Sequence, residues 1–386
     1  MRVAIDIRRV GSFGIGTYIR NVVRLLARIG EQNEYVLIGP PERFAELGEL
    51  PANFTLVALP HLERSFRAYF AFDRIVREQR CDIVHVPHMF WRPRAMSKPY
   101  LVTAHDVLTY MFPRADRSAF RRFFHKSLSH RALANASRIL SVSHFTKTEI
   151  VRYFKIPEGK IEVIPNAIDE RFRLGHATDA DRALIAERYQ VNYPFLLYAG
   201  NIKPHKNLGR IIEAFSVLKA ELKKEGKFPD LKLIIIGDEL SQHPDLRRTV
   251  VKSGVGGDVR FLGFVSIDTL RIFYDLAKIF VFPSLYEGFG LPPLEAMALG
   301  TPVVTSNTSS LPEVVGQAAV LVNPENVFEI TRALRRVLLD QELRDKLKVA
   351  SIEQAQRFSW ETSVRRLLEV YNQVGAASRA VQSGSS

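Results

Sequence analysis

Short apolar runs alternate with amphipathic stretches, and this pattern occurs twice along the chain. Short apolar runs of this kind are typical of buried strands. In the first half they lie at 3–7, 35–38, 83–86, 100–103, 139–142 and 161–164. In the second half they lie at 195–199, 231–236, 259–262, 279–282 and 303–305. Strands that alternate with helices form parallel sheets covered by helices, so the sequence predicts an α/β protein.

The segments between these runs predict the helices and the division into domains. Residues 18–29 carry apolar side chains at helical spacing and end at Gly30, and residues 208–223 predict a second helix. A chain of 386 residues is too long for one ordinary core and suits two domains. The polar segment 173–192 shows no strand pattern and predicts the link between them. The small, polar residues 375–386 predict a disordered tail.

Composition and charge bear on where the protein acts and on what. No apolar run reaches the ~18 residues that a membrane-spanning helix needs, and the chain opens with a strand-like run rather than a signal peptide. A single cysteine, Cys81, excludes an intramolecular disulfide and fits the cytoplasm. The net charge is +13, and residues 1–175 hold 28 Lys and Arg against 17 Asp and Glu. This basic half fits an anionic membrane surface, a polyanionic acceptor or nucleic acid, and equally a solvated surface.

The segment 284–300 carries the strongest chemical pattern. A predicted strand ends there, a glycine loop follows, and Pro292 and Pro293 suit the first turn of a helix. Backbone N–H groups at a helix start bind phosphate. Two carboxylates, Glu287 and Glu295, flank this anion site, and hydrogen bonds from ribose or sugar hydroxyls would explain them. The structural alternative is a solvated Glu287 and a Glu295 favoured in the first turn by the helix dipole.

A second loop brings cations to the same edge of the second sheet. Lys203, His205 and Lys206 follow the predicted strand 195–199. Cations at a strand end can neutralise a diphosphate leaving group without a bound metal ion. An ordinary basic surface loop is the alternative.

Two loops follow predicted strands of the first half. Gly11, Gly14 and Gly16 resemble a phosphate-binding loop, although they lack the spacing of the dinucleotide fingerprint and no Walker lysine follows. A tight turn explains them nearly as well. His105 follows the run 100–103 and could hydrogen-bond a sugar hydroxyl or carry a proton, whereas a lone histidine is more often structural.

The run Glu287–Glu295 resembles the Glu-x7-Glu motif of retaining glycosyltransferases of family 4, which have the GT-B fold. Similar segments lie at 163–169, 235–237, 259–263, 296–304 and 311–316, so the resemblance covers nearly the whole chain. It implies two Rossmann-like domains whose parallel sheets face each other across a cleft. Residues 1–175 would bind the acceptor and residues 176–365 the nucleotide sugar. Residues 366–386 would complete a helix that packs back toward the first domain, followed by the tail.

The resemblance implies roles for the donor-binding residues of the second domain. Lys206, with Lys203 nearby, would bind the diphosphate. Backbone N–H groups of the glycine loop would bind it too, at Gly288, Phe289, Gly290 and Leu291. Glu295 would bind the ribose hydroxyls, and Glu287 would contact the transferred sugar near the reacting carbon. The backbone near Phe264 and Val265 would meet the base.

In the first domain, the resemblance implies that His105 contacts the sugar and that Gly14 and Gly16 approach the phosphate or the acceptor. Two positions depart from the family pattern: Asn201 stands where many members have arginine, and Ala167 where glycine is common. The first departure leaves the second phosphate-binding cation open between Lys203 and His205.

The resemblance implies transfer with retained anomeric configuration, without a metal ion or other cofactor. The pair Asp179 and Asp181 resembles a metal-binding motif of another transferase fold, but it lies in the polar link and is interpreted as chance. GDP-mannose is favoured as donor and a UDP-sugar comes next. The acceptor would be a glycan or a lipid-linked glycan.

A peripheral membrane location is suggested by aromatic side chains interleaved with arginines in two regions, 64–80 and 110–124. The alternative is that the aromatics are core and the arginines line the acceptor site. Other functions also remain as alternatives: a sugar-nucleotide epimerase of the same fold, a phosphorylase, or an anionic-surface-binding protein. No nucleic-acid partner is expected, because no nucleic-acid motif is evident and the charge follows one domain rather than a recognition helix.

Overall fold

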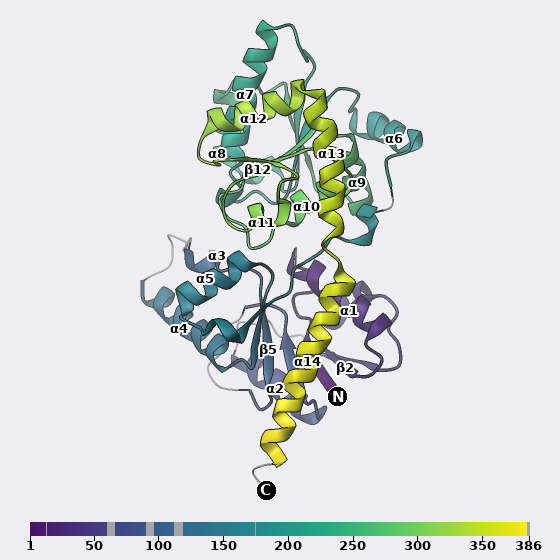
Figure 1. Cartoon of the computed structure of the whole chain (residues 1–386), viewed down its shortest axis with the longest axis vertical. Coiled ribbons are helices and arrows are strands. Elements are labelled where there is room, and N and C mark those ends of the chain that lie inside the picture. The colour runs from purple at the N-terminus through teal and green to yellow at the C-terminus, as the bar shows by residue number, and fades with distance from the viewer. Residues whose placement is uncertain (13, 60–65, 90–95, 112–118, 174, 384–386) are drawn as a thin grey trace. The chain divides into compact units, whose positions relative to one another are not determined.

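The computed structural model describes residues 1–12, 14–59, 66–89, 96–111, 119–173 and 175–383 (Figure 1). The chain forms two compact units. The first unit comprises residues 1–166 and 359–386, and the second comprises residues 167–358. The chain therefore passes from one unit to the other at Asn166–Ala167 and again at Phe358–Ser359.

The first unit is built on a seven-stranded sheet in the order β3-β2-β1-β4-β5-β6-β7, with every neighbouring pair parallel. Its strands are β1 (Arg2–Asp6), β2 (Glu34–Gly39), β3 (Phe54–Ala58), β4 (Ile83–Val86), β5 (Tyr100–Ala104), β6 (Arg138–Ser141) and β7 (Ile161–Val163). The apolar runs predicted all of these except β3. That strand lies at the sheet edge with three of its five residues exposed, so its sequence lacks a continuous apolar run.

Helices surround this sheet. They are α1 (Ile15–Ile29), α2 (Phe66–Glu78), α3 (Leu108–Met111), α4 (Ala119–Asn135), α5 (His144–Phe154) and α14 (Trp360–Ser383), with short 3₁₀ helices η1 (Pro41–Leu47) and η2 (Glu158–Lys160). The last helix, α14, packs against α1 and β4 (yellow in Figure 1). The prediction of a disordered tail from residue 375 is wrong as far as Ser383, because these residues form the last turns of α14. Three alanines at 376, 377 and 380 favour the helix there.

The second unit is built on a six-stranded parallel sheet in the order β10-β9-β8-β11-β12-β13. Its strands are β8 (Phe195–Ala199), β9 (Lys232–Ile236), β10 (Val259–Gly263), β11 (Ile279–Phe282), β12 (Val303–Ser306) and β13 (Val320–Val322). Only β13, a three-residue edge strand, was not predicted. Its helices are α6 (Asp179–Tyr189), α7 (Leu208–Lys224), α8 (Pro244–Lys252), α9 (Ile267–Leu276), α10 (Leu291–Ala298), α11 (Leu311–Val315), α12 (Val327–Leu339) and α13 (Gln341–Gln356), with 3₁₀ helices η3 (Glu170–Arg173), η4 (Pro204–Lys206) and η5 (Leu240–Gln242).

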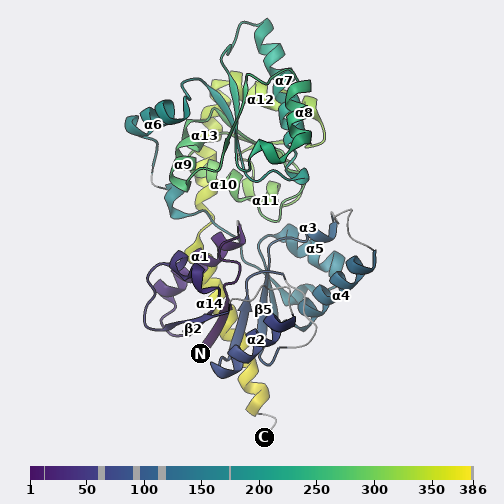
Figure 2. The same ribbon diagram turned by 180° about the vertical axis from the view of Figure 1, so that it is seen from behind.

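The helices of the second unit cover both faces of its sheet. In both views α7, α8 and α12 lie together on one face, and α9, α10 and α13 lie on the other (Figures 1 and 2). The four central strands are therefore buried on both sides. Their sequences read as continuous apolar runs for that reason, which is why the pattern predicted them.

The polar segment 173–192, interpreted from the sequence as the link between domains, lies within the second unit and contains a helix. Residues Asp179–Tyr189 form α6, which begins with a capping box. The side chain of Thr178 accepts a hydrogen bond from the N–H of Asp181 at 3.2 Å, and the carboxylate of Asp181 accepts one from the N–H of Thr178 at 2.9 Å. The pair Asp179 and Asp181 thus lies in the first turn of a helix.

Candidate functional site

In the second unit, the carboxyl ends of β8 and β11 carry the segments with the strongest chemical pattern. The glycine loop after β11 leads into α10 at Gly290, whose backbone φ is 112°. A Cβ added there would lie 2.7 Å from Cδ2 of Leu311, so both the conformation and the space favour glycine. Pro292 and Pro293 have no N–H. The donors at this helix start are therefore the backbone N–H groups of Leu291 and of the loop before it.

Two serines of the loop after β12 hold the glycine loop in place. The N–H of Glu287 donates to the hydroxyl oxygen of Ser309 at 3.1 Å. The hydroxyl of the buried Ser310 lies 2.9 Å from the carbonyl oxygen of Glu287 and 2.7 Å from that of Phe289, and donates to them. The side chain of Phe289 is itself buried, with its ring edge-on to Phe358. The loop backbone is therefore fixed on both sides of Glu287.

The cationic loop after β8 is anchored to the same region by Asn207. This residue has a left-handed backbone, with φ at 64°, and its side chain is buried. Its amide nitrogen donates to the carbonyl oxygens of Pro283 at 2.9 Å and Pro324 at 2.7 Å. The carbonyl oxygen of His205 accepts from the N–H of Leu285 at 2.7 Å. These bonds bring Lys206 beside the glycine loop. The anchoring role of Asn207 was not predicted, because both of its acceptors are distant in the sequence.

Lys206 and Glu287 form an ion pair. The ammonium nitrogen of Lys206 lies 2.6 Å from Oε1 of Glu287, and the two side chains are only 13% and 12% exposed. The same nitrogen lies 5.1 Å from the ring centre of Phe282. Glu287 is therefore not the solvated loop residue of the structural alternative.

The other two candidate cations of this loop differ from Lys206. Burial, followed by the charge of Lys206, lowers the pKa of His205 to about 4, while Glu287 opposes this shift. The imidazole is therefore uncharged at neutral pH and supplies no cation there. Lys203 is exposed and remains the candidate for a second cation.

Glu295 lies in the second turn of α10, so the helix-dipole interpretation of this residue is wrong. Its Oε2 accepts a hydrogen bond from the hydroxyl of Tyr274 at 3.0 Å. Burial raises the pKa of Glu295 to about 7; the bond from Tyr274 acts in the opposite direction, and the charge of Asp169 adds to the rise. The two partners come from α9 and from the segment before η3, so no local pattern could have predicted them.

The residues that follow β10 and β9 lie at two further strand ends of this unit. Phe264 follows β10 and is 76% exposed, whereas its neighbour Val265 is buried. Gly237 follows β9 with φ at 151°, and a Cβ there would lie 1.9 Å from the carbonyl oxygen of Gly200. The ends of β8 and β9 therefore approach as closely as only glycine allows.

In the first unit, the glycine loop after β1 leads into α1. Gly14 precedes the helix, and a Cβ added to it would meet nothing within 4 Å. A Cβ on Gly16 would lie 2.1 Å from the carbonyl oxygen of Val10. Packing against the chain's own backbone therefore explains Gly16, whereas Gly14 borders open space.

His105 follows β5, and its Nε2 lies 3.1 Å from the carbonyl oxygen of Pro87. Burial is the main cause that lowers its pKa to about 4, so the ring is neutral at pH 7. Because a carbonyl oxygen only accepts, Nε2 carries the proton and Nδ1 of the neutral ring is an acceptor. The ring of Tyr18 packs edge-on against His105, with ring centres 5.0 Å apart.

A buried polar network lies behind Tyr18. The hydroxyl oxygens of Tyr18 and Thr103 lie 3.2 Å apart, and Nε2 of His85 lies 2.8 Å from that of Thr103. Nδ1 of His85 lies 2.6 Å from the hydroxyl oxygen of Tyr371, on α14. Burial lowers the pKa of His85 to about 3, so the network is uncharged. It ties α14 to the sheet that carries His105.

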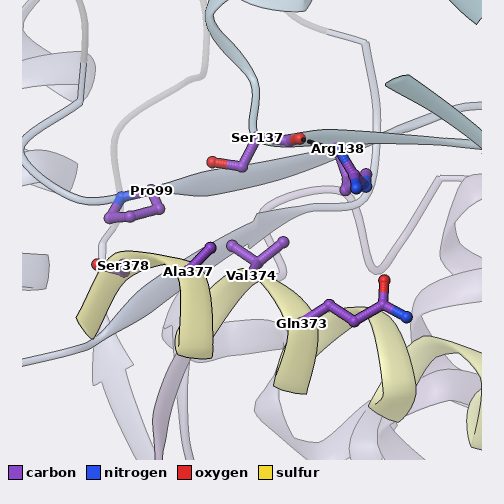
Figure 3. A pocket seen from close by; sticks show the side chains of 7 residues that line it. All are labelled: Pro99, Ser137, Arg138, Gln373, Val374, Ala377 and Ser378. Atoms are coloured by element: carbon purple, nitrogen blue, oxygen red, sulfur yellow. Dashed lines mark hydrogen bonds between the residues drawn. The ribbon is translucent and has the colours of Figure 1, made fainter. Parts of the chain in front are cut away.

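A pocket lies at the opposite edge of this sheet, where β5 and β6 begin (Figure 3). Its cavity volume is about 360 Å³, and α14 forms its other wall. It is lined by Pro99, Ser137, Arg138, Gln373, Val374, Ala377 and Ser378. None of the residues singled out from the sequence lines it.

Within the described residues, no group of three or more His, Cys, Asp and Glu side chains is placed to hold a metal ion. Among the described helices, none is long and apolar enough to cross a membrane.

Each half of the chain matches the model of a known protein family. Residues 14–172 match the model of "Glycosyltransferase Family 4", and residues 182–354 match that of "Glycosyl transferases group 1". O-antigen chain mannosyltransferase B of Escherichia coli is 33% identical over 297 residues, which are 77% of this chain and 75% of that protein. The serotype-specific mannosyltransferase WbdA of the same organism is 32% identical over 266 residues, which are 69% of this chain and 32% of that longer protein.

Solved structures share the fold. Sucrose-phosphate synthase from Thermosynechococcus elongatus superposes with a TM-score of 0.78 at 20% identity, over 98% of this chain and 100% of that one. WaaG, a glycosyltransferase involved in lipopolysaccharide biosynthesis, gives 0.73 at 16% identity, over 95% and 99%. The fold is therefore the GT-B architecture of two Rossmann-like domains. The chain belongs to the glycosyl transferases of group 1, in glycosyltransferase family 4.

Proposed function

We propose that this glycosyltransferase moves a sugar from a nucleoside diphosphate to a glycan with retention of anomeric configuration. The observation that carries the proposal is the position of Lys206 and Glu287 beside the start of α10, one turn before Glu295. A cation and a helix N-terminus together suit a diphosphate. Two carboxylates beside an anion site suit the hydroxyls of the ribose and of the sugar.

Each residue of the second unit takes a separate part in donor binding. Lys206, Lys203 and the N–H groups of Gly288, Phe289, Gly290 and Leu291 hold the diphosphate. Glu295 accepts hydrogen bonds from the ribose hydroxyls. Glu287 contacts the transferred sugar. The exposed ring of Phe264, together with the backbone at Val265, meets the base.

From the first unit, His105 accepts a hydrogen bond from a sugar hydroxyl through Nδ1, and Gly14 borders the phosphate or the acceptor. In the proposed chemistry the bond from the anomeric carbon to the diphosphate breaks, and an acceptor hydroxyl forms the new bond on the same face and passes its proton to the departing diphosphate. The contribution of the chain is to stabilise the leaving group and to position the reactants. The charge of Lys206 and the helix start serve the leaving group, and no metal ion or other cofactor is proposed.

GDP-mannose is the favoured donor, because the more similar curated relatives carry the name mannosyltransferase. A UDP-sugar is the second choice. The proposed acceptor is a glycan or lipid-linked glycan of a surface polysaccharide, in line with the names of the O-antigen relatives. An epimerase would convert the nucleotide sugar without an acceptor, so incubation with the nucleotide sugar alone distinguishes that alternative.

We also propose a peripheral location on an anionic membrane. In the region 64–80, Phe72, Ile75 and Val76 belong to the core, but Phe70 is 52% exposed and Arg67, Arg74 and Arg77 are exposed. In the region 110–124, Phe123 is 74% exposed, while Arg64 and residues 112–118 lie outside the described part of the chain. Sedimentation with anionic vesicles at low salt should carry the protein into the pellet. A protein that stays in the supernatant would refute this location.

Thermal stabilisation by GDP, UDP, ADP and dTDP tests the donor site. A diphosphate at about 100 times its dissociation constant should add about 2.7 kcal/mol to the stability of the folded protein. Glu295→Ala and Lys206→Ala should reduce the shift, each measured against the same variant without nucleotide. Glu353→Ala and Lys252→Ala, which alter exposed residues of α13 and α8, are matched controls. Absence of any shift in a folded wild type would refute the donor site.

A further inference from the structure

Lys206 is already paired with a carboxylate in the structure. Its ammonium nitrogen lies 2.6 Å from Glu287, and both side chains are nearly nine-tenths buried. A hydrogen bond between two charged groups is strong at such a distance, and partial burial strengthens it further. The pair carries no net charge. A diphosphate that reaches this loop therefore meets a lysine whose charge Glu287 neutralises.

The backbone on both sides of this ion pair is fixed. Asn207 anchors the residue after Lys206 to two carbonyl oxygens of neighbouring segments. Ser309 and Ser310 hold the N–H and the carbonyl of Glu287. Neither segment can shift without loss of these bonds. Rotation of the two long side chains opens the pair with these bonds intact.

Neighbouring charges do not replace Lys206. His205 is neutral at pH 7, because burial is the main cause that lowers its pKa to about 4. Lys203 is exposed, and its interactions are weakened by solvent. Strong binding of a diphosphate at this loop therefore requires the charge of Lys206. In the structure this charge is already paired with that of Glu287.

We propose that Lys206 and Glu287 are an exchange pair, in which the diphosphate takes Lys206 from Glu287 and so releases the carboxylate for the sugar hydroxyls. This inference rests on the proposed function of the site. It makes recognition of the sugar conditional on the diphosphate. A sugar that carries no diphosphate does not open the pair, so Glu287 stays bound to Lys206 and is withheld from its hydroxyls.

Calorimetric titration with GDP, or with UDP if GDP does not bind, tests the exchange in a double-mutant cycle. The four proteins are the wild type, Glu287→Gln, Lys206→Met and the double variant. Methionine is an unbranched side chain of similar length that can stay beside the ring of Phe282, and glutamine keeps the shape of the glutamate. Exposed Glu353→Gln is the control for loss of one negative charge. Melting curves verify that every variant is folded.

Exchange predicts that Glu287→Gln tightens nucleotide binding in the wild type at least about tenfold more than it does in the Lys206→Met background. Equal tightening in both backgrounds would mean simple repulsion between Glu287 and the phosphates, and would overturn the exchange. Weaker binding by Glu287→Gln would mean that Glu287 positions Lys206 for the phosphate, which also overturns it. If no nucleoside diphosphate binds the wild type, the proposed function fails instead.

Discussion

The environment of Glu295 predicts a specific pH dependence of stability, which Glu295→Gln should remove. Burial raises the pKa of this carboxyl from its ordinary 4.5 to about 7, with a smaller contribution from the charge of Asp169. Glutamine has the same shape and can still accept the hydrogen bond from Tyr274. It carries no charge at any pH. The substitution therefore isolates the cost of ionising this one buried group.

The direction and the size of the change in stability with pH follow from the pKa of Glu295 in the unfolded and in the folded chain. Below about pH 4.5 the carboxyl is protonated in both the folded and the unfolded chain. Between pH 4.5 and about 7 the unfolded chain releases the proton and the folded chain keeps it, so stability falls as pH rises. At about 1.4 kcal/mol per pH unit the full loss is about 3 kcal/mol. The side chain retains some contact with solvent, which reduces the expected value to about 2 kcal/mol.

Urea denaturation between pH 4.5 and 8.5 measures this effect. The free energy of unfolding of Glu295→Gln, relative to wild type, should increase by about 2 kcal/mol across the range, and most of the increase should fall below pH 7.5. Glu353→Gln, at an exposed position of α13, is the matched control and should give a flat difference. A Glu295→Gln difference that is also flat would refute the reasoning, because Glu295 would then ionise as readily in the folded chain as in the unfolded one.

Other substitutions test contacts within each of the two units, and each is measured by the free energy of unfolding. Asn207→Ala should cost about 3 kcal/mol, because two buried carbonyl oxygens lose their donor and the new residue keeps a left-handed backbone; a loss below about 1 kcal/mol would contradict this. Tyr371→Phe should cost about 1–3 kcal/mol by depriving Nδ1 of the buried His85 of its hydrogen-bond partner, and a neutral result would contradict this. Gly16→Ala should cost more than about 2 kcal/mol, whereas Gly14→Ala should be tolerated, and similar losses for the two would argue against the packing explanation.

Most of the fold was predictable because a buried strand appears in the sequence as a run of apolar residues. Strands covered on both faces by helices must be apolar throughout, and eleven of the thirteen strands in the described part of the chain were predicted from such apolar runs. The two that were missed, β3 and β13, are edge strands with exposed residues. The prediction of disorder at residues 375–383 was wrong for a different reason. Small residues without an apolar pattern suggested disorder, yet they continue a helix whose earlier turns are buried against α1.

The candidate site was predictable only in part. The glycine loop, Lys206 and the two glutamates were visible as residues at strand ends, and the family comparisons support the class of enzyme that they suggested. The partners of those residues were not visible. Asn207 and Ser310 hold the loops through hydrogen bonds to backbone carbonyls far away in the sequence.

Most of the strands, the resemblance to the family and the charged residues at strand ends could be read from the sequence, because each depends on residues that are neighbours along the chain. Which groups contact one another depends on the tertiary structure. Lys206 and Glu287 lie 81 positions apart, and His85 and Tyr371 lie 286 apart. The pKa of Glu295 depends on the removal of water by several elements at once. Distances in space and desolvation set these interactions, and a periodic pattern along the chain records neither.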